Sequence, residues 1–161
     1  MTSRKKSAFI AKSAVIAALY VLLTLLSSLF GLSGGVIQFR LSEALCLLPI
    51  FTPAAVPGLF IGCLLANILS GSVLWDVVFG SAATLFGALG AYALRKKRPF
   101  IAALPTVFAN TLIVPPILRF AYGAEGSLLF FALTVFIGEI VCAAFLGTLL
   151  AGALRRSKID F

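Results

Sequence analysis

AFIAKSAVIAALYVLLTLLSSLF, residues 8–30, is the stretch that decides the fold, because it is one long apolar run in which Lys12 carries the only charge. A helix needs about 20 apolar residues to cross the hydrocarbon core of a bilayer. A basic segment precedes the run, as in a secretory signal peptide, but the apolar region of a signal peptide is only about 7–15 residues long. We therefore expect this stretch to be an uncleaved transmembrane helix.

The rest of the chain is equally apolar. Of its 161 residues, 61% are hydrophobic and 11% are charged, and its mean hydropathy is +1.15. A soluble domain is about half apolar and a quarter charged. Glycine, proline and charged clusters separate six apolar runs, near residues 8–30, 41–54, 57–72, 76–94, 100–121 and 127–154. The sequence predicts one all-α integral membrane domain over residues 1–161, a bundle of six transmembrane helices.

The basic residues predict the orientation of this bundle. The net charge is +8, and eleven of the thirteen lysine and arginine residues fall into three blocks beside apolar runs. The positive-inside rule places such blocks in the cytoplasm, so they explain the charge without a nucleic-acid partner. Six crossings then put both termini in the cytoplasm. The blocks are Arg4, Lys5, Lys6 and Lys12; Arg95, Lys96, Lys97 and Arg98; and Arg155, Arg156 and Lys158.

The second apolar run, residues 41–54, is short and rich in proline. Pro49, Pro53 and the following Pro57 lack the backbone donor that a regular helix uses. We expect a short, proline-kinked helix, which is either broken at a site or simply bent for packing. Irregular backbone inside a membrane is tolerated where protein buries it or where a cavity hydrates it. This run is therefore a candidate place for a binding site.

Polar side chains within apolar runs are candidates for function, because they are costly in hydrocarbon. Glu139 lies near the middle of the last run, where a carboxylate must be paired, protonated or in contact with a hydrated cavity. We expect ligand contact there, with a structural pair as the alternative. The other candidates gather at the predicted extracellular half or lie within the runs. They are Gln38, Arg40, Ser42, Glu43, Asn67, Trp75, Asp76, Asn110, Arg119 and Tyr122.

Several of these candidates have a plain structural alternative. Trp75 and Tyr122 could be interfacial anchors, because aromatic residues with a polar tip collect at membrane surfaces. Arg40 and Glu43 stand three residues apart and could form a local ion pair. Asn67 and Asn110 could bind a ligand or cross-link helices.

The sequence also argues against several classes of site. It has no glycine-rich loop for nucleotide phosphates, so any ATP used in transport must bind another subunit. It has no histidine and few acids, which disfavours a metal site, and no arrangement of residues typical of a hydrolase. We expect neither a resident cofactor nor an enzyme. We interpret Cys46, Cys63 and Cys142 as packing residues.

Small residues recur at helical spacing on two runs. Ala14 and Ala18 stand one turn apart on the first, and Gly58, Gly62, Ala66 and Ser70 follow one another on the third. Such stripes let helices approach closely. Spacing alone favours packing inside the chain over docking to another protein.

The stretch VIQFRLSEALCLLPIFTPAAVPGLFIGCLLANILSG, residues 36–71, resembles the signature region of the QueT family of queuosine-precursor transporters. The short chain, the basic first helix with Ala14 and Ala18, and the Trp75–Asp76 pair fit that family as well. The resemblance implies a substrate-binding S-component of an energy-coupling factor (ECF) transporter in the cell membrane. Its partners would be a transmembrane T-component and two cytosolic ATPases, which would account for the missing phosphate loop.

The resemblance also implies how such a subunit works. In S-components an A-x-x-x-A stripe on the first helix docks against the T-component, and Ala14 to Ala18 match it. The subunit would capture substrate from outside under the loop of residues 31–40, with Gly31, Gly34 and Gly35 permitting movement. It would then topple in the membrane and release substrate inward when the partner ATPases hydrolyse ATP.

The implied ligand is a 7-deazaguanine, in its cyano or its aminomethyl form. Its guanine-like edge offers two adjacent N–H donors that one carboxylate can accept, and a carbonyl that an amide or a guanidinium can donate to. Another vitamin-like heterocycle and a membrane assembly factor without a pocket are the alternatives. The candidate acceptors are Glu139 and Glu43; the donors are Asn67, Asn110, Gln38 and Arg40; the stacking rings are Trp75, Phe39 and Tyr122; Asp76 and Arg119 complete the set.

Overall fold

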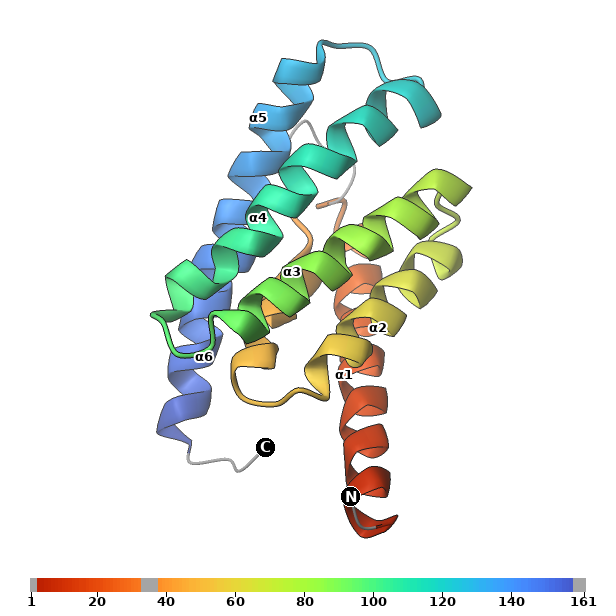
Figure 1. Ribbon diagram of the computed structural model, residues 1–161. Helices are drawn as coiled ribbons and strands as arrows, with labels where there is room; N and C mark the ends of the chain where they lie inside the picture. Colours follow the sequence, from red (N-terminus) through yellow and green to blue (C-terminus); the bar gives the residue numbers. More distant parts are fainter. Residues whose placement is uncertain (1–2, 33–37, 158–161) are drawn as a thin grey trace.

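The structure is a computed structural model that describes residues 3–32 and 38–157, and every regular element in these two ranges is a helix (Figure 1). Short 3₁₀ or π-helical segments, labelled η, interrupt or extend the α-helices. The elements are α1 (Ser3–Leu29), η1 (Leu41–Ile50), α2 (Ala55–Leu69), η2 (Asp76–Gly80), α3 (Ser81–Ala93), α4 (Pro99–Pro116), η3 (Ile117–Ala121), α5 (Leu128–Glu139), η4 (Ile140–Leu146) and α6 (Gly147–Arg156).

Four of the helical stretches are long and apolar enough to cross a membrane: Ser3–Leu29, Asp76–Ala93, Pro99–Ala121 and Leu128–Arg156. The two other apolar helices, η1 and α2, are shorter, at 10 and 15 residues. The structure therefore confirms an all-helical fold with several membrane-spanning helices. That all six predicted runs cross the bilayer stays a prediction.

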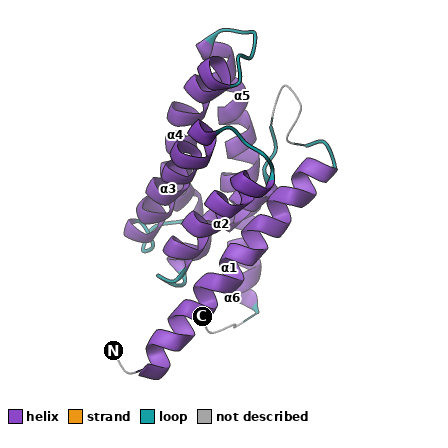
Figure 2. Ribbon diagram, turned by 90° about the vertical axis from the view of Figure 1, so that its right-hand side faces the viewer, coloured by secondary structure: helices purple, strands orange, loops and turns teal. Residues whose placement is uncertain are grey.

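The first turn of α1 and the last turn of α6 lie at the same end of the molecule, the lower end in Figure 1. The connection between α4 and α5 lies at the opposite end. Figure 2 shows the N-terminal turns of α1 extending beyond the rest of the bundle, and these turns carry Arg4, Lys5 and Lys6. An even number of crossings requires the first and the last helix to begin and end on the same side of the membrane, as they do here. That this side is the cytoplasm stays a prediction.

The outside of the bundle is covered with large apolar side chains. Leu29 and Leu112 are each 79% exposed, and the other long helices present exposed leucine, isoleucine or phenylalanine as well. A soluble monomer rarely exposes a contiguous apolar area of more than a few hundred Å². Lipid is the solvent that such a surface fits, so we describe the chain as a multi-pass membrane protein.

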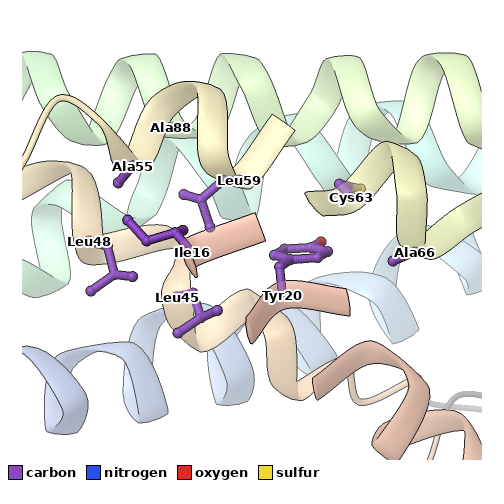
Figure 3. Close-up of a cluster of buried hydrophobic side chains, with 9 residues drawn as sticks. All are labelled: Ile16, Tyr20, Leu45, Leu48, Ala55, Leu59, Cys63, Ala66 and Ala88. Carbon is purple, nitrogen blue, oxygen red and sulfur yellow. The ribbon is translucent and has the colours of Figure 1, made fainter. Parts of the chain in front are cut away.

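Helices α1 and α2 pack at very short range because glycine lines the contact. A Cβ atom placed on Gly62 would lie 2.8 Å from Cβ of Tyr20, and one on Gly58 would lie 2.8 Å from the backbone oxygen of Ser13. The glycines of the second small-residue stripe thus serve internal packing. Figure 3 shows the apolar cluster around this contact, formed by Ile16, Tyr20, Leu45, Leu48, Ala55, Leu59, Cys63, Ala66 and Ala88.

Polar side chains along one face of α1 hold η1 in place. The Tyr20 hydroxyl donates a hydrogen bond to Oε1 of Glu43, and the hydroxyls of Thr24 and Ser42 lie 2.8 Å apart. The Leu41 amide donates to Oγ of Ser27 over 3.0 Å. These contacts hold the start of η1 against the buried face of α1.

The second helix differs from the prediction in its backbone. We expected a proline-kinked helix, whereas η1 is a 3₁₀-helix that contains Pro49. At about 2 Å per residue a ten-residue 3₁₀-helix is roughly 20 Å long, less than the roughly 30 Å of a bilayer core. The short and irregular character of this segment was predictable; its helix type was not.

Candidate functional site

The acidic side chains of the bundle stand where regular α-helix is interrupted. Glu43 lies in the first turn of η1, and Asp76 is the first residue of the π-helical segment η2. Glu139 is the last residue of α5, directly before the π-helical segment η4. Single π-helical turns inside α-helices occur frequently at functional sites. The acidic residues therefore coincide with the irregular helical segments, and both features mark the surroundings of these segments as the candidate site.

A polar cavity of about 370 Å³ opens beside these segments. Binding pockets for small molecules commonly measure about 300–1,000 Å³. Hydroxyl, amide and charged side chains form most of the wall, although the surrounding bundle is apolar. Its lining residues are Thr24, Ser28, Gln38, Arg40, Asn67, Ser70, Ser72, Asp76, Leu118, Tyr122 and Ala124.

Asp76 connects three parts of this cavity. A guanidinium nitrogen of Arg40 lies 3.5 Å from Oδ2 of Asp76, and the Tyr122 hydroxyl donates to the same oxygen over 3.0 Å. The Asn67 amide donates to the backbone oxygen of Asp76 over 3.2 Å. The Asp76 side chain is only 4% exposed and that of Arg40 22% exposed, so water screens the pair incompletely. The predicted local pair of Arg40 with Glu43 is wrong, because Arg40 pairs with Asp76 and Glu43 accepts from Tyr20.

Glu139 lies in a second, much smaller cavity. This cavity of about 10 Å³ is lined by Gln38, Arg40, Val114, Val135 and Glu139, and we call it the Glu139 pocket. Oε1 of Glu139 accepts a hydrogen bond of 2.9 Å from the Asn110 amide. Its other oxygen, Oε2, is buried and has no hydrogen-bond partner among the described residues. Gln38 and Arg40 line both cavities.

Glu43 is the most deeply buried acid, at 1% exposure. Tyr20 occupies its Oε1, and Oε2 has no hydrogen-bond partner in the described part of the chain. Glu43 is absent from the lining of both cavities.

Besides Glu43, Glu139 and its partner Asn110, two more predicted site residues, Trp75 and Arg119, do not line the polar cavity. Trp75 is 61% exposed, stacks on Phe79 with ring centroids 5.5 Å apart, and borders an apolar cavity of about 440 Å³. Arg119 is exposed and donates to the backbone oxygen of Ala124 over 3.2 Å. The larger cavity holds no charged side chain, so we place the candidate site in the smaller polar one. The lining of the 440 Å³ cavity is Trp75, Phe79, Ile113, Pro116, Ile117, Phe120 and Ala121.

Sequence reasoning missed the hydroxyl side chains that α1 contributes. Tyr20 and Thr24 stand one turn apart in an otherwise apolar run, and Thr24 and Ser28 line the polar cavity. Their spacing of four residues is the signal that could have identified this face, because residues four apart lie on the same side of a helix.

Neither a metal site nor a disulfide is present in residues 3–32 and 38–157. The described residues contain no group of three or more histidine, cysteine or acidic side chains that could hold a metal ion. Cys46, Cys63 and Cys142 are buried free thiols, and each packs against other helices.

The sequence is similar to one family of known transport proteins. The sequence model of the QueT transporter family matches residues 10–156. The queuosine precursor transporter QueT of Lactococcus lactis subsp. cremoris (strain MG1363) is 40% identical over 89 residues. That match spans 54% of this chain and 52% of the relative, about half of each. No solved structure matches the chain.

Proposed function

Because the chain belongs to the QueT transporter family, we propose that it is the substrate-binding S-component of an ECF transporter that imports a 7-deazaguanine precursor of queuosine. The match of this family along residues 10–156 confirms the predicted family and the prediction of a transporter of small molecules rather than an enzyme. The observation that carries the finer proposal is the polar cavity inside an apolar bundle. Such a cavity needs a polar occupant to balance its desolvated groups.

The groups around the cavity complement a flat, guanine-like ring. Arg40 has five N–H donors, and its recorded side-chain partner among the described residues is Asp76, so the guanidinium can also donate to a ligand carbonyl. Gln38 offers an amide beside it. The cavity volume of about 370 Å³ lies within the range usual for small-molecule pockets, which supports a ligand of this size.

Of the three predicted stacking rings, Tyr122 lines the polar cavity, and its hydroxyl donates to Asp76. Trp75 borders the apolar cavity instead, and Phe39 lines neither of these two cavities. We propose that the ligand ring lies against Tyr122, Leu118 and the aliphatic parts of the polar side chains in the wall.

The energising part of the transporter is proposed to lie on other subunits. The chain lacks a glycine-rich phosphate loop, so ATP would bind two cytosolic ATPases that couple to it through a T-component in the cell membrane. Ala14 and Ala18 are both exposed on α1, on the face turned away from α2. An exposed stripe of small residues supports their role as the docking surface for the T-component.

The predicted capture loop is only partly described. Gly31 has φ +69°, a conformation that favours glycine. Gly34 and Gly35 lie outside the described residues. Capture of substrate from outside and toppling in the membrane stay proposals that follow from the family.

A growth experiment tests the proposed function. A bacterium that can neither make nor import queuosine precursors would receive this chain, its T-component and the two ATPases, with aminomethyl- or cyano-7-deazaguanine in the medium. We expect queuosine in tRNA only when all subunits are present and the ATPases are active. Queuosine formed equally without the T-component would contradict the S-component assignment.

A further inference from the structure

The Glu139 pocket shares two lining residues, Gln38 and Arg40, with the polar cavity, so the two spaces adjoin. Resting on the proposed function, we infer that this pocket receives a protonated amine carried as a side group by the substrate, while the ring occupies the polar cavity. Glu139 would then determine specificity by selecting the side group, independently of the contacts that hold the ring.

The size of the pocket limits what can enter it. Its volume of about 10 Å³ is close to the minimum that holds one water molecule. An ammonium group is of similar size, whereas a planar amide, a carboxylate or a second ring is too large. Val114 and Val135 form apolar walls and are themselves 6% and 7% exposed, so the occupant would be screened from bulk water.

The hydrogen-bonding state of Glu139 identifies the kind of occupant. The side chain is 7% exposed, its Oε1 is satisfied by Asn110, and its buried Oε2 has no partner among the described residues. Buried polar atoms in folded proteins almost always have a hydrogen-bond partner. The substrate can supply the partner that Oε2 lacks. A protonated amine would donate to Oε2 and hold the carboxyl group in its ionised form, whereas a nitrile group has no hydrogen to donate.

The charges around the pocket favour a cation over a neutral donor. Arg40 is the one cationic side chain that lines either the polar cavity or the Glu139 pocket, and it already pairs with Asp76. Glu139 accepts its hydrogen bond from Asn110, a neutral amide. A protonated amine would balance the carboxylate and form a charge-assisted hydrogen bond, which is stronger than a neutral one.

Calorimetric titration of the purified chain with a matched ligand pair tests this inference. Aminomethyl- and cyano-7-deazaguanine share the ring and differ only in the side group. We expect the wild-type chain to bind the aminomethyl form about tenfold or more tightly than the cyano form, the range expected of a hydrogen bond between charged groups. Glu139→Gln keeps the shape of the side chain, and we expect it to abolish this preference while leaving affinity for the cyano form nearly unchanged.

Two further variants separate the pocket from general stability. Val135→Ile fills the Glu139 pocket but keeps its carboxylate, and we expect it to reduce the preference for the amine even if Glu139→Gln does not fold. Glu125→Gln makes the same change at an exposed acid that lines neither cavity and should leave the preference intact. The melting temperature of each ligand-free variant shows whether it is folded.

The outcomes distinguish this inference from the proposed function. Equal affinity of the wild-type chain for the two forms, or a preference that survives both Glu139→Gln and Val135→Ile, overturns the role of the Glu139 pocket and leaves the proposed function standing. Binding of neither form overturns the proposed function, and the inference with it.

Discussion

Asp76 is the side chain on which the order of the polar cavity depends. It holds Arg40 by an ion pair, accepts from Tyr122 and accepts through its backbone from Asn67. Removing the charge of Asp76 leaves Arg40 without its ion-pair partner. Removing the hydroxyl of Tyr122 deletes a single hydrogen bond.

We therefore predict a graded effect of two substitutions on substrate affinity. Asp76→Asn should weaken binding by about tenfold, because Arg40 loses the charge that orients it, and Tyr122→Phe by a smaller factor, since one hydrogen bond contributes about 1 kcal/mol. Titration of each purified variant measures the effect. Arg119→Gln is the control, because Arg119 is exposed and lines neither cavity; a loss of affinity there would contradict this location of the site.

Single residues show where sequence reasoning succeeds and fails. Glu139, Asn67 and Asn110 could be singled out by one principle, the cost of polar groups in hydrocarbon, and all three are at least 93% buried. The partner of Arg40 could not be predicted in this way. A spacing of three residues makes Arg40 and Glu43 neighbours only if both are helical, and Arg40 has an extended backbone before η1.

Among the elements, the contact of α1 with α2 depends most strongly on a missing side chain. We predict that Gly62→Leu strongly destabilises the chain, because even a Cβ atom at this position would lie 2.8 Å from Tyr20 Cβ and 3.0 Å from the backbone of Ala17. Overpacking of this kind typically costs about 1–3 kcal/mol or more.

The matched control for this contact is Gly152→Ala on α6, where an added Cβ meets nothing within 4 Å. Thermal unfolding in detergent should show a lower midpoint for the Gly62 variant and an unchanged one for the Gly152 variant. Equal midpoints would mean that α1 and α2 do not pack as described.

The elements were predictable in position but not in helix type. Backbone groups in hydrocarbon must be paired, so apolar runs form helices, and each of the six predicted runs overlaps helical structure in the described ranges. Four of these helical stretches are long and apolar enough to cross a membrane. The 3₁₀ form of η1 and the π-helical form of η2, η3 and η4 depend on contacts between distant segments. The bond from the Leu41 amide to Ser27 is one of them, and a local pattern of apolar residues does not contain it.

For the whole molecule, the face of α1 that carries Ala14 and Ala18 should be the site of assembly. We predict that Ala14→Trp prevents purification of a complex with the T-component but leaves substrate affinity unchanged, since Ala14 is exposed and does not line the polar cavity. Co-purification and titration of the same variant measure the two properties.

A matched tryptophan elsewhere controls for the bulk of the side chain. Leu112→Trp changes a residue of α4 that is 79% exposed, and the complex should still form. If Ala14→Trp assembles as well as Leu112→Trp does, the docking surface lies elsewhere on the chain.

The central claim is that the polar cavity of this membrane protein binds a 7-deazaguanine. Calorimetric titration of the purified chain with aminomethyl- and cyano-7-deazaguanine, with guanine, thiamine and riboflavin as controls, tests it most directly. We expect tight binding of a deazaguanine and no binding of guanine, thiamine or riboflavin. Heat of binding from thiamine or riboflavin, with silence from both deazaguanines, would contradict it.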